Sequence, residues 1–314
     1  MSTNEMRIVF MGTPEFAVAS LQAMVDAGYN IVGVITAPDK PAGRGMKMTE
    51  CAVKKYAMEN GLFTLQPEKL KNPEFIDELR KLNADLQVVV AFRMLPEIVW
   101  NMPPLGTINV HGSLLPHYRG AAPINWAIIN GENMTGVTTF KLQHEIDTGN
   151  ILMQETIPIS ENETAGQLHD EMKEVGAKLL VETIQGMQKG NLKEVNQLTV
   201  NEADSSQLKH APKIFTETCK IDWTSTCQSI HNLIRGLSPY PGAIATLNGK
   251  MLKIYSSSKE ITTSIHLPGQ YVTDEKAYLK FACIDGYIHV TELQLEGKKR
   301  MTINDFLRGY RFLH

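Results

Sequence analysis

The feature of this sequence that most constrains its fold is the alternation of short apolar strands and helical segments across its first two-thirds. Residues 7–11 and 31–36 are expected strands, and the apolar residues between them recur at helical spacing. Pro14 suits the first turn of that helix and Gly28 suits its end. A strand–helix–strand order predicts a mainly parallel sheet with right-handed crossovers.

The centre of this sheet is predicted by residues 86–91 (LQVVVA), which lack polar alternation. That pattern is typical of a parallel strand buried on both faces. Further strands are expected over residues 107–111, 136–142 and 151–157, and a helix is expected over 167–188. The predicted fold class is α/β, with a Rossmann-like domain built on a mainly parallel sheet.

The last third of the chain has a different pattern of expected secondary structure. A helix is expected over residues 225–235, and Thr302 and Asp305 have the spacing of a capping box at a closing helix. Short strands joined by tight turns are typical of a small β-barrel, here of the OB type. The turn signals between them are Asn248-Gly249, Asp285-Gly286 and Glu296-Gly297.

Length and charge also divide the chain. Its 314 residues are enough for about two domains, and we expect a catalytic domain over 1–190, a linker over 191–211 and a second domain over 212–314. Residues 1–204 carry 17 basic and 25 acidic side chains, whereas residues 205–314 carry 14 and 9. The second domain is either suited to a polyanionic partner or simply an ordinary basic domain.

Cysteine spacing and hydropathy exclude several classes of protein. The four cysteines have no C-x-x-C spacing, which argues against a disulfide framework or a structural zinc site, so no metal is expected. No signal peptide is visible, and no run of 18 apolar residues occurs. We therefore expect a cytoplasmic protein without a membrane partner. We also expect a monomer, because one chain holds a complete set of candidate site residues.

The chemistry is concentrated at the end of the strand predicted over 107–111. Asn109 and His111 are two residues apart, so their side chains share one face, at the edge where open parallel sheets bind ligands. Asn109 offers a donor to a developing oxyanion, and His111 offers a donor or a proton shuttle. Asp147, in an Asp-Thr-Gly turn, is the candidate carboxylate that orients His111. No serine or cysteine has the neighbours that would activate it as a nucleophile. This favours direct transfer of a group between substrates over a covalent enzyme intermediate.

Each of these signals is weak alone. A histidine at a strand end is more often structural than catalytic, and Asp before Thr-Gly is ordinary turn chemistry. His144 is interpreted as a surface residue. The turn at residues 12–14 lacks the G-x-G-x-x-G pattern, and Glu15 would repel a pyrophosphate, so a nicotinamide oxidoreductase ranks low.

Taken together, the motifs are specific. The chain resembles the N10-formyltetrahydrofolate-dependent formyltransferases, and the resemblance covers nearly its whole length. It implies that Asn109, His111 and Asp147 are the catalytic trio and that 10-formyltetrahydrofolate is the formyl donor, bound as a cosubstrate. The motifs that carry it are Asn109-x-His111-x-Ser113-Leu114-Leu115-Pro116, Tyr118-Arg119-Gly120, Pro123-Ile124 and Asp147-Thr148-Gly149.

The same resemblance implies a folate site. The backbone around 90–95, including Phe92 and Met94, would line the pterin pocket. The family pattern there is Ala-Tyr-Gly, whereas this chain reads Ala91-Phe92-Arg93, and a change from glycine to arginine alters the allowed backbone and adds a charge. The other implied folate-binding residues are Ser113, Leu114, Leu115 and Pro116.

Within the family, the chain is most similar to members that act on a charged initiator tRNA. Residues 38–45 (PDKPAGRG), in an expected Pro/Gly loop over 37–48, match the loop that contacts the acceptor stem in those members. The resemblance implies an initiator Met-tRNA partner, with tRNA contacts from Arg44 and from Lys40 and Lys47 beside it. Ile221-Asp222-Trp223, Ile234-Arg235 and Pro239-Tyr240-Pro241-Gly242-Ala243 resemble the start of their C-terminal domain. Further candidate RNA contacts are Lys298, Lys299, Arg300, Arg308 and Arg311.

The expected reaction is transfer of a formyl group from 10-formyltetrahydrofolate to the α-amino group of methionine on initiator Met-tRNA, for translation initiation. Asn109 and His111 would stabilise the tetrahedral oxyanion, and Asp147 would hold His111. Two alternatives stay open. One is an RNA-binding protein with a vestigial pocket. The other is a sugar-nucleotide N-formyltransferase of the same family, which needs neither the 38–45 loop nor a basic second domain.

Overall fold

The computed structural model describes residues 5–42, 47–200 and 208–312. The chain forms two compact units, of which the first comprises Met1–Arg119, Gly136–Ile157 and His169–Lys209. The second comprises Gly120–Thr135, Pro158–Leu168 and His210–His314. The domain boundaries expected at 190 and 211 stay a prediction. Within the described residues, no helix has both the length and the apolar composition that crossing a bilayer requires.

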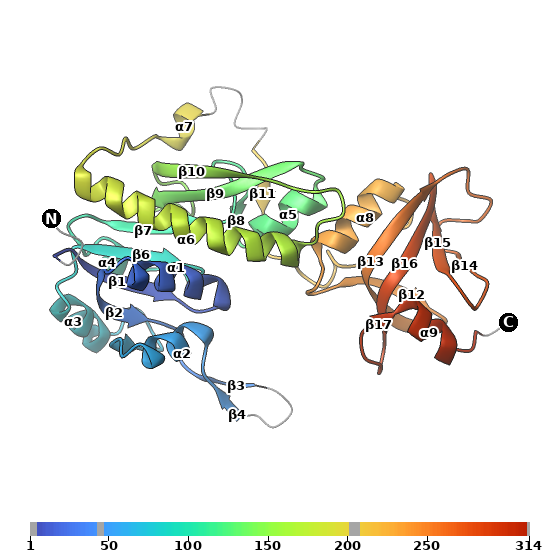
Figure 1. Cartoon of the computed structure of the whole chain (residues 1–314), viewed down its shortest axis with the longest axis horizontal. Coiled ribbons are helices and arrows are strands. Elements are labelled where there is room, and N and C mark those ends of the chain that lie inside the picture. The colour runs from blue at the N-terminus through green and yellow to red at the C-terminus, as the bar shows by residue number, and fades with distance from the viewer. Residues whose placement is uncertain (1–4, 43–46, 201–207, 313–314) are drawn as a thin grey trace. The chain divides into compact units, whose positions relative to one another are not determined.

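The helices and strands follow one another in Figure 1 from blue to red. Up to residue 200 they are β1 (Arg7–Gly12), α1 (Glu15–Asp26), β2 (Asn30–Ile35), β3 (Lys40–Ala42), β4 (Lys47–Thr49), α2 (Ala52–Glu59), β5 (Thr64–Leu65), α3 (Pro73–Lys81), β6 (Leu86–Val90), α4 (Glu97–Trp100), β7 (Thr107–His111), β8 (Arg119–Gly120), α5 (Pro123–Ile129), β9 (Met134–Lys141), β10 (Ile151–Pro158), α6 (Ala165–Lys189) and α7 (Gln197–Val200). From residue 208 they are β11 (His210–Ala211), α8 (Cys227–Gly236), β12 (Ala243–Leu247), β13 (Lys250–Ile261), β14 (Tyr271–Thr273), β15 (Leu279–Cys283), β16 (Gly286–Leu295), β17 (Met301–Thr302) and α9 (Ile303–Gly309).

The first unit is built on a seven-stranded sheet with the order β10-β9-β7-β6-β1-β2-β5. β5, β2, β1, β6 and β7 run parallel to one another, and β9 runs antiparallel to β7. All five residues of β6 are buried, as expected for a central strand covered on both faces. The predicted Rossmann-like, mainly parallel sheet is therefore confirmed.

The two faces of this sheet receive different helices. Val89 of β6 lies in one apolar cluster with Phe75 of α3, and Val89 is paired in register with Asn109 of the parallel strand β7. Asn109 therefore points to the side that α3 covers, and the two-residue alternation sends Val110 to the other side. There α6 packs so closely that a Cβ on Gly176 would lie 3.1 Å from Val110. Figure 1 shows α1 and α6 over the same face of the sheet.

Two segments expected to be irregular contain regular structure. The expected loop over 37–48 includes β3 and β4, which pair antiparallel with Lys40 opposite Thr49, so the loop prediction was wrong for these strands. The proline and glycine residues that predicted a loop are also common around short hairpins. In the expected linker, α7 follows Val195, whose N–H donates to the carbonyl of Ile151 at 2.9 Å. This part of the chain is therefore packed against β10.

The second unit holds an antiparallel sheet with the order β12-β13-β16-β15-β14, and β17 pairs with β16. Each of the three predicted tight turns joins two paired strands. The sheet is a curled half-barrel of the OB-like kind, with α8 and α9 packed on its apolar face around residues such as Ile234, Leu252 and Phe281. Thr302 caps α9 by accepting from the N–H of Asp305 at 3.3 Å, as its spacing predicts.

Candidate active site

The candidate site begins at the end of β7. His111 is buried, at 7% exposure, and Asn109 two residues earlier is half-buried. Across residues 5–42, 47–200 and 208–312, no hydrogen-bond partner of the Asn109 side-chain amide is found. A half-buried amide with unused donors is available to a ligand. The structure therefore places both residues on one strand, as predicted, with the amide ready to donate.

The His111 ring has two different edges. Its Nε2 lies 2.9 Å from the carbonyl oxygen of Tyr118. Because a carbonyl only accepts, Nε2 carries the proton and donates it. Nδ1 faces Oδ2 of Asp147 at 3.9 Å, which is longer than a direct hydrogen bond. The predicted pair of His111 and Asp147 is thus brought together, with Nδ1 as the edge that faces the carboxylate.

The Asp147 turn connects β9 to β10 and has an unusual backbone. Asp147 has a φ of 55°, in the left-handed region, which Asp and Asn adopt more readily than most residues. Gly149 is required by packing, because a Cβ there would lie 1.6 Å from the carbonyl oxygen of Lys141. The Asp-Thr-Gly sequence is therefore explained by the turn itself, and the turn aims the Asp147 carboxylate at His111.

A cavity of about 380 Å³ lies beside this turn within the first unit. Four of its lining residues, Trp100, Gln143, Glu145 and Asn196, are not predicted by any motif in the sequence. The His144 ring is 75% exposed, in keeping with its interpretation as a surface residue, yet it lines the cavity and meets Trp100 edge-on with 5.7 Å between the ring centroids. The proximity of Gln143 and His144 to Asp147 in the sequence was the available signal. The lining residues are Trp100, Arg119, Gln143, His144, Glu145, Thr148 and Asn196.

Arg119 brings a cation to this cavity. Its Nε and Nη2 donate to Oε1 of Gln197 at 3.0 and 2.5 Å. Burial lowers the pKa of Arg119, and the carboxylates of Asp147 and Glu145 act in the opposite direction. A guanidinium stays protonated at neutral pH, so the cavity carries a fixed positive charge.

The segment expected to bind folate after β7 is tightly integrated in the fold. Ser113 is fully buried and its Oγ donates to the carbonyl of His117 at 2.7 Å. The N–H of Leu115 donates to Oγ1 of Thr138 at 3.1 Å, and its side chain packs in an apolar cluster. These two side chains are committed to local structure. A folate-binding role for residues 113–116 stays a prediction.

The segment after β6 holds the residue that departs from the family pattern. Ala91 has a φ of 46°, Phe92 is half-buried and Met94 is 73% exposed. Arg93 donates from Nη1 to the carbonyl of Glu68 at 2.7 Å and from Nη2 to the carbonyl of Pro67. Burial lowers the pKa of Arg93. The arginine thus ties this segment to the chain after β5.

The residues expected to contact tRNA are only partly described. Lys40 is exposed at the start of β3. Lys47 begins β4, and Arg44 lies outside the described residues. In the basic tail, Arg300 pairs with Glu292 and Arg308 with Asp305, whereas Lys298, Lys299 and Arg311 are exposed. These RNA contacts stay predictions.

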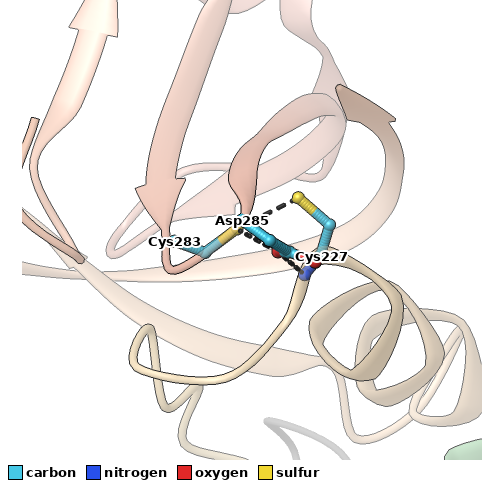
Figure 2. Close-up of side chains that lie close together, drawn as sticks. All are labelled: Cys227, Cys283 and Asp285. Atoms are coloured by element: carbon cyan, nitrogen blue, oxygen red, sulfur yellow. Dashed lines mark hydrogen bonds between the residues drawn. The ribbon is translucent and has the colours of Figure 1, made fainter. Parts of the chain in front are cut away.

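One cluster within the described residues has the composition of a metal site. Cys227, Cys283 and Asp285 lie close together in the second unit (Figure 2). The two Sγ atoms are 3.1 Å apart, whereas two thiolates on one tetrahedral zinc ion would be about 3.8 Å apart. Oδ1 of Asp285 accepts from the N–H of Cys227, the first residue of α8, at 2.7 Å. Burial raises the pKa of both thiols, which disfavours thiolate ligands, so helix capping and packing account for the cluster.

The fold and site together define a class of protein. A Rossmann-like sheet carries an amide, an imidazole and a carboxylate near one strand end, and an OB-like unit follows it. The chain belongs to the formyl transferase family. The family model described as "Formyl transferase" matches residues 6–184, and the model described as "Formyl transferase, C-terminal domain" matches residues 213–311.

Relatives agree with this assignment, and a solved structure shares the fold. The methionyl-tRNA formyltransferase of Bacteroides fragilis is 51% identical, over 99% of this chain and 97% of that relative. The enzyme of the same name from Flavobacterium johnsoniae is 49% identical, over 98% and 97%. The crystal structure of HypX from Aquifex aeolicus in complex with tetrahydrofolic acid has a similar fold, with a TM-score of 0.66 and 18% identity, over 98% of this chain and 49% of that chain.

Proposed function

We propose that this protein transfers the formyl group of 10-formyltetrahydrofolate to the α-amino group of methionine on initiator Met-tRNA, for translation initiation. The observation that carries the proposal is the free Asn109 amide beside His111 and Asp147, in a chain that aligns along its whole length with methionyl-tRNA formyltransferases. The excess of basic residues over 205–314, which include the OB-like sheet, supports an RNA acceptor.

The reaction begins when the methionine amine attacks the formyl carbon. A tetrahedral oxyanion forms, and the bond between that carbon and N10 of the folate then breaks. Asn109 donates to the oxyanion from its side-chain amide. Because the Tyr118 carbonyl occupies Nε2, Nδ1 is the edge of His111 that serves the reaction. Removing one such donor typically costs about 10²–10³ in rate.

Asp147 assists the proton transfers of the reaction. The amine loses a proton as it forms the new bond, and N10 gains one as it leaves. Because Nδ1 of His111 and Oδ2 of Asp147 are 3.9 Å apart, one water molecule beside both atoms can hydrogen-bond to each and carry the proton between them. General acid–base assistance of this kind is worth roughly 10²–10⁴ in rate.

The donor is assigned to the cavity beside the Asp147 turn. Its volume of about 380 Å³ lies within the range of small-molecule sites. The residues proposed to complete the folate site are Phe92, Met94, Ser113, Leu114, Leu115 and Pro116. For the acceptor, we assign Arg44, Lys40 and Lys47 to the tRNA. A monomer in the cytoplasm is sufficient for this reaction, since the first unit supplies all three catalytic groups.

The acceptor is tested with the whole chain and labelled 10-formyltetrahydrofolate. Charged initiator tRNA and amino sugar nucleotides are offered in parallel, with His111→Ala as the inactive control. The proposal expects label on the methionine of the tRNA only. Label on a sugar nucleotide with none on Met-tRNA would instead assign the protein to sugar N-formylation. Arg44→Ala should reduce the rate mainly at low tRNA concentration.

A further inference from the structure

Gln197 is buried within the segment that the sequence predicts to be a linker. It begins α7, and its side chain is 1% exposed. Its Nε2 donates to the carbonyls of Asp147 at 2.9 Å and Gly149 at 2.7 Å. Its Oε1 accepts from Nε and Nη2 of Arg119. A side-chain amide has two donors and two acceptor lone pairs, so all four positions are used.

No other side chain satisfies these partners equally well. Two carbonyls need two donors, and a guanidinium needs an acceptor, which together describe a side-chain amide. Glutamate keeps the acceptor but loses both donors, and an apolar residue leaves every partner unpaired in a buried place. Buried polar groups without partners are costly. The composition of this small network therefore specifies a side-chain amide.

The groups that Gln197 holds are those on which the proposed chemistry depends. The left-handed backbone of Asp147 persists only where its surroundings fix it. One side of the turn is fixed by the contact between Gly149 and the Lys141 carbonyl, and Gln197 fixes the other through two carbonyls. The Arg119 guanidinium, which the Asp147 carboxylate attracts, is held by its two hydrogen bonds to Gln197.

We propose that Gln197 is a positioning residue for formyl transfer. Its single amide fixes both the Asp147–Gly149 turn and the Arg119 guanidinium. The Asp147 carboxylate therefore stays opposite Nδ1 of His111 while Arg119 lines the cavity. The kinetic consequence rests on the proposed function, whereas the effect on the turn does not.

The kinetic test compares Gln197→Ala, Gln197→Glu and the matched control Gln188→Ala. Gln188 carries a buried Nε2 with no hydrogen-bond partner among the described residues, so losing it removes an amide without releasing the turn. Gln197→Ala is expected to lower kcat by about 10²-fold, because small displacements of catalytic groups cost that much. KM for the tRNA should keep its wild-type value, and the pH profile of kcat should move. Gln197→Glu should lose a similar factor, and Gln188→Ala should keep the wild-type kcat.

A second readout needs no substrate. The backbone N–H of Lys141 donates to the carbonyl of Asn150 across this turn, and its hydrogen exchange should become faster in Gln197→Ala than in the wild type and in Gln188→Ala. An unchanged kcat and unchanged exchange in a folded Gln197→Ala protein would overturn the proposal. A Gln197→Glu enzyme with wild-type kcat would also overturn it, because the two donors would then be dispensable. A wild type that formylates no acceptor would overturn the proposed function alone, and the exchange result would still decide the role of Gln197.

Discussion

The candidate site in the first unit and the exposed surface of the second unit hold their charged and polar groups in different ways. In the first unit a few buried or half-buried groups are held by main-chain and amide partners, as His111 is by the Tyr118 carbonyl. In the second unit many charges are exposed, and some are neutralised in pairs, as Arg300 is by Glu292. Small losses of geometry should therefore damage the candidate site severely, whereas single exposed charges of the second unit should each matter little.

The largest effect should come from Asp147→Asn. Asparagine accepts the left-handed backbone at this position, so the turn should fold normally. The negative charge facing His111 is lost, and formyl transfer should fall by about 10²–10⁴. The check is kcat at saturating tRNA together with the thermal unfolding midpoint. Normal turnover in the folded variant would remove Asp147 from the mechanism.

A stability effect should follow from the buried histidine of the second unit. Burial, with Lys259 and Arg235 nearby, lowers the pKa of His231 from 6.5 to about 4. The unfolded chain therefore binds a proton between these two pH values that the folded chain does not. The free energy of unfolding therefore keeps its full value, as far as His231 is concerned, above pH 6.5. It decreases as the pH falls to about 4, by on the order of 3 kcal/mol.

Denaturant unfolding from pH 7 to pH 4 measures this effect. His231→Gln should flatten the loss of stability across this window, because the titrating group is gone. The matched control is His210→Gln, the same substitution at an exposed position of the same unit, and it should keep the wild-type slope. An identical slope in wild type and His231→Gln would show that His231 does not carry the acid sensitivity.

A smaller effect is expected where the chain departs from the family pattern. Arg93→Ala removes the hydrogen bonds to the carbonyls of Pro67 and Glu68 and frees the segment that includes Phe92 and Met94. KM for the formyl donor should rise by about tenfold, the equivalent of one charged hydrogen bond, with kcat nearly unchanged. Arg93→Lys is the matched control for charge and should recover only part of the loss. A KM equal to the wild type in Arg93→Ala would separate this segment from folate binding.

The smallest effect should come from the exposed basic tail. Lys298 and Lys299 have no ion-pair partner among the described residues. Replacing both with alanine should reduce the salt dependence of tRNA binding by up to about two phosphate contacts, with a modest loss of affinity. Lys276→Ala removes an exposed lysine elsewhere in the same unit and serves as the control. An unchanged salt slope in the double variant would place the RNA elsewhere.

Patterns that depend on local periodicity were predicted well from the sequence. The buried strand over 86–90 and the common face of Asn109 and His111 follow from alternation, which any sheet imposes. The proximity of Asp147 to His111 was inferred as a candidate pairing, and the structure places the two side chains together. The requirement for glycine at position 149 was not predicted from the sequence. It is explained by the close approach of the Lys141 carbonyl.

What the sequence did not predict are contacts between distant segments. Gln197 lies 50 residues from Asp147 along the chain, and nothing in its local sequence marks it as buried. Trp100 and Arg93 likewise acquire their roles from neighbours that the fold supplies. The short hairpin of β3 and β4 was missed because three-residue strands have too few positions to show alternation.

The most direct test separates chemistry from tRNA binding. Single-turnover formylation and tRNA affinity are measured together for the wild type, His111→Ala and the Lys298→Ala/Lys299→Ala double variant. The account predicts that His111→Ala loses the rate at saturation and keeps its tRNA affinity, whereas the double variant keeps the saturating rate and binds tRNA more weakly. A His111→Ala enzyme that transfers formyl at the wild-type saturating rate, and only binds tRNA more weakly, would contradict it.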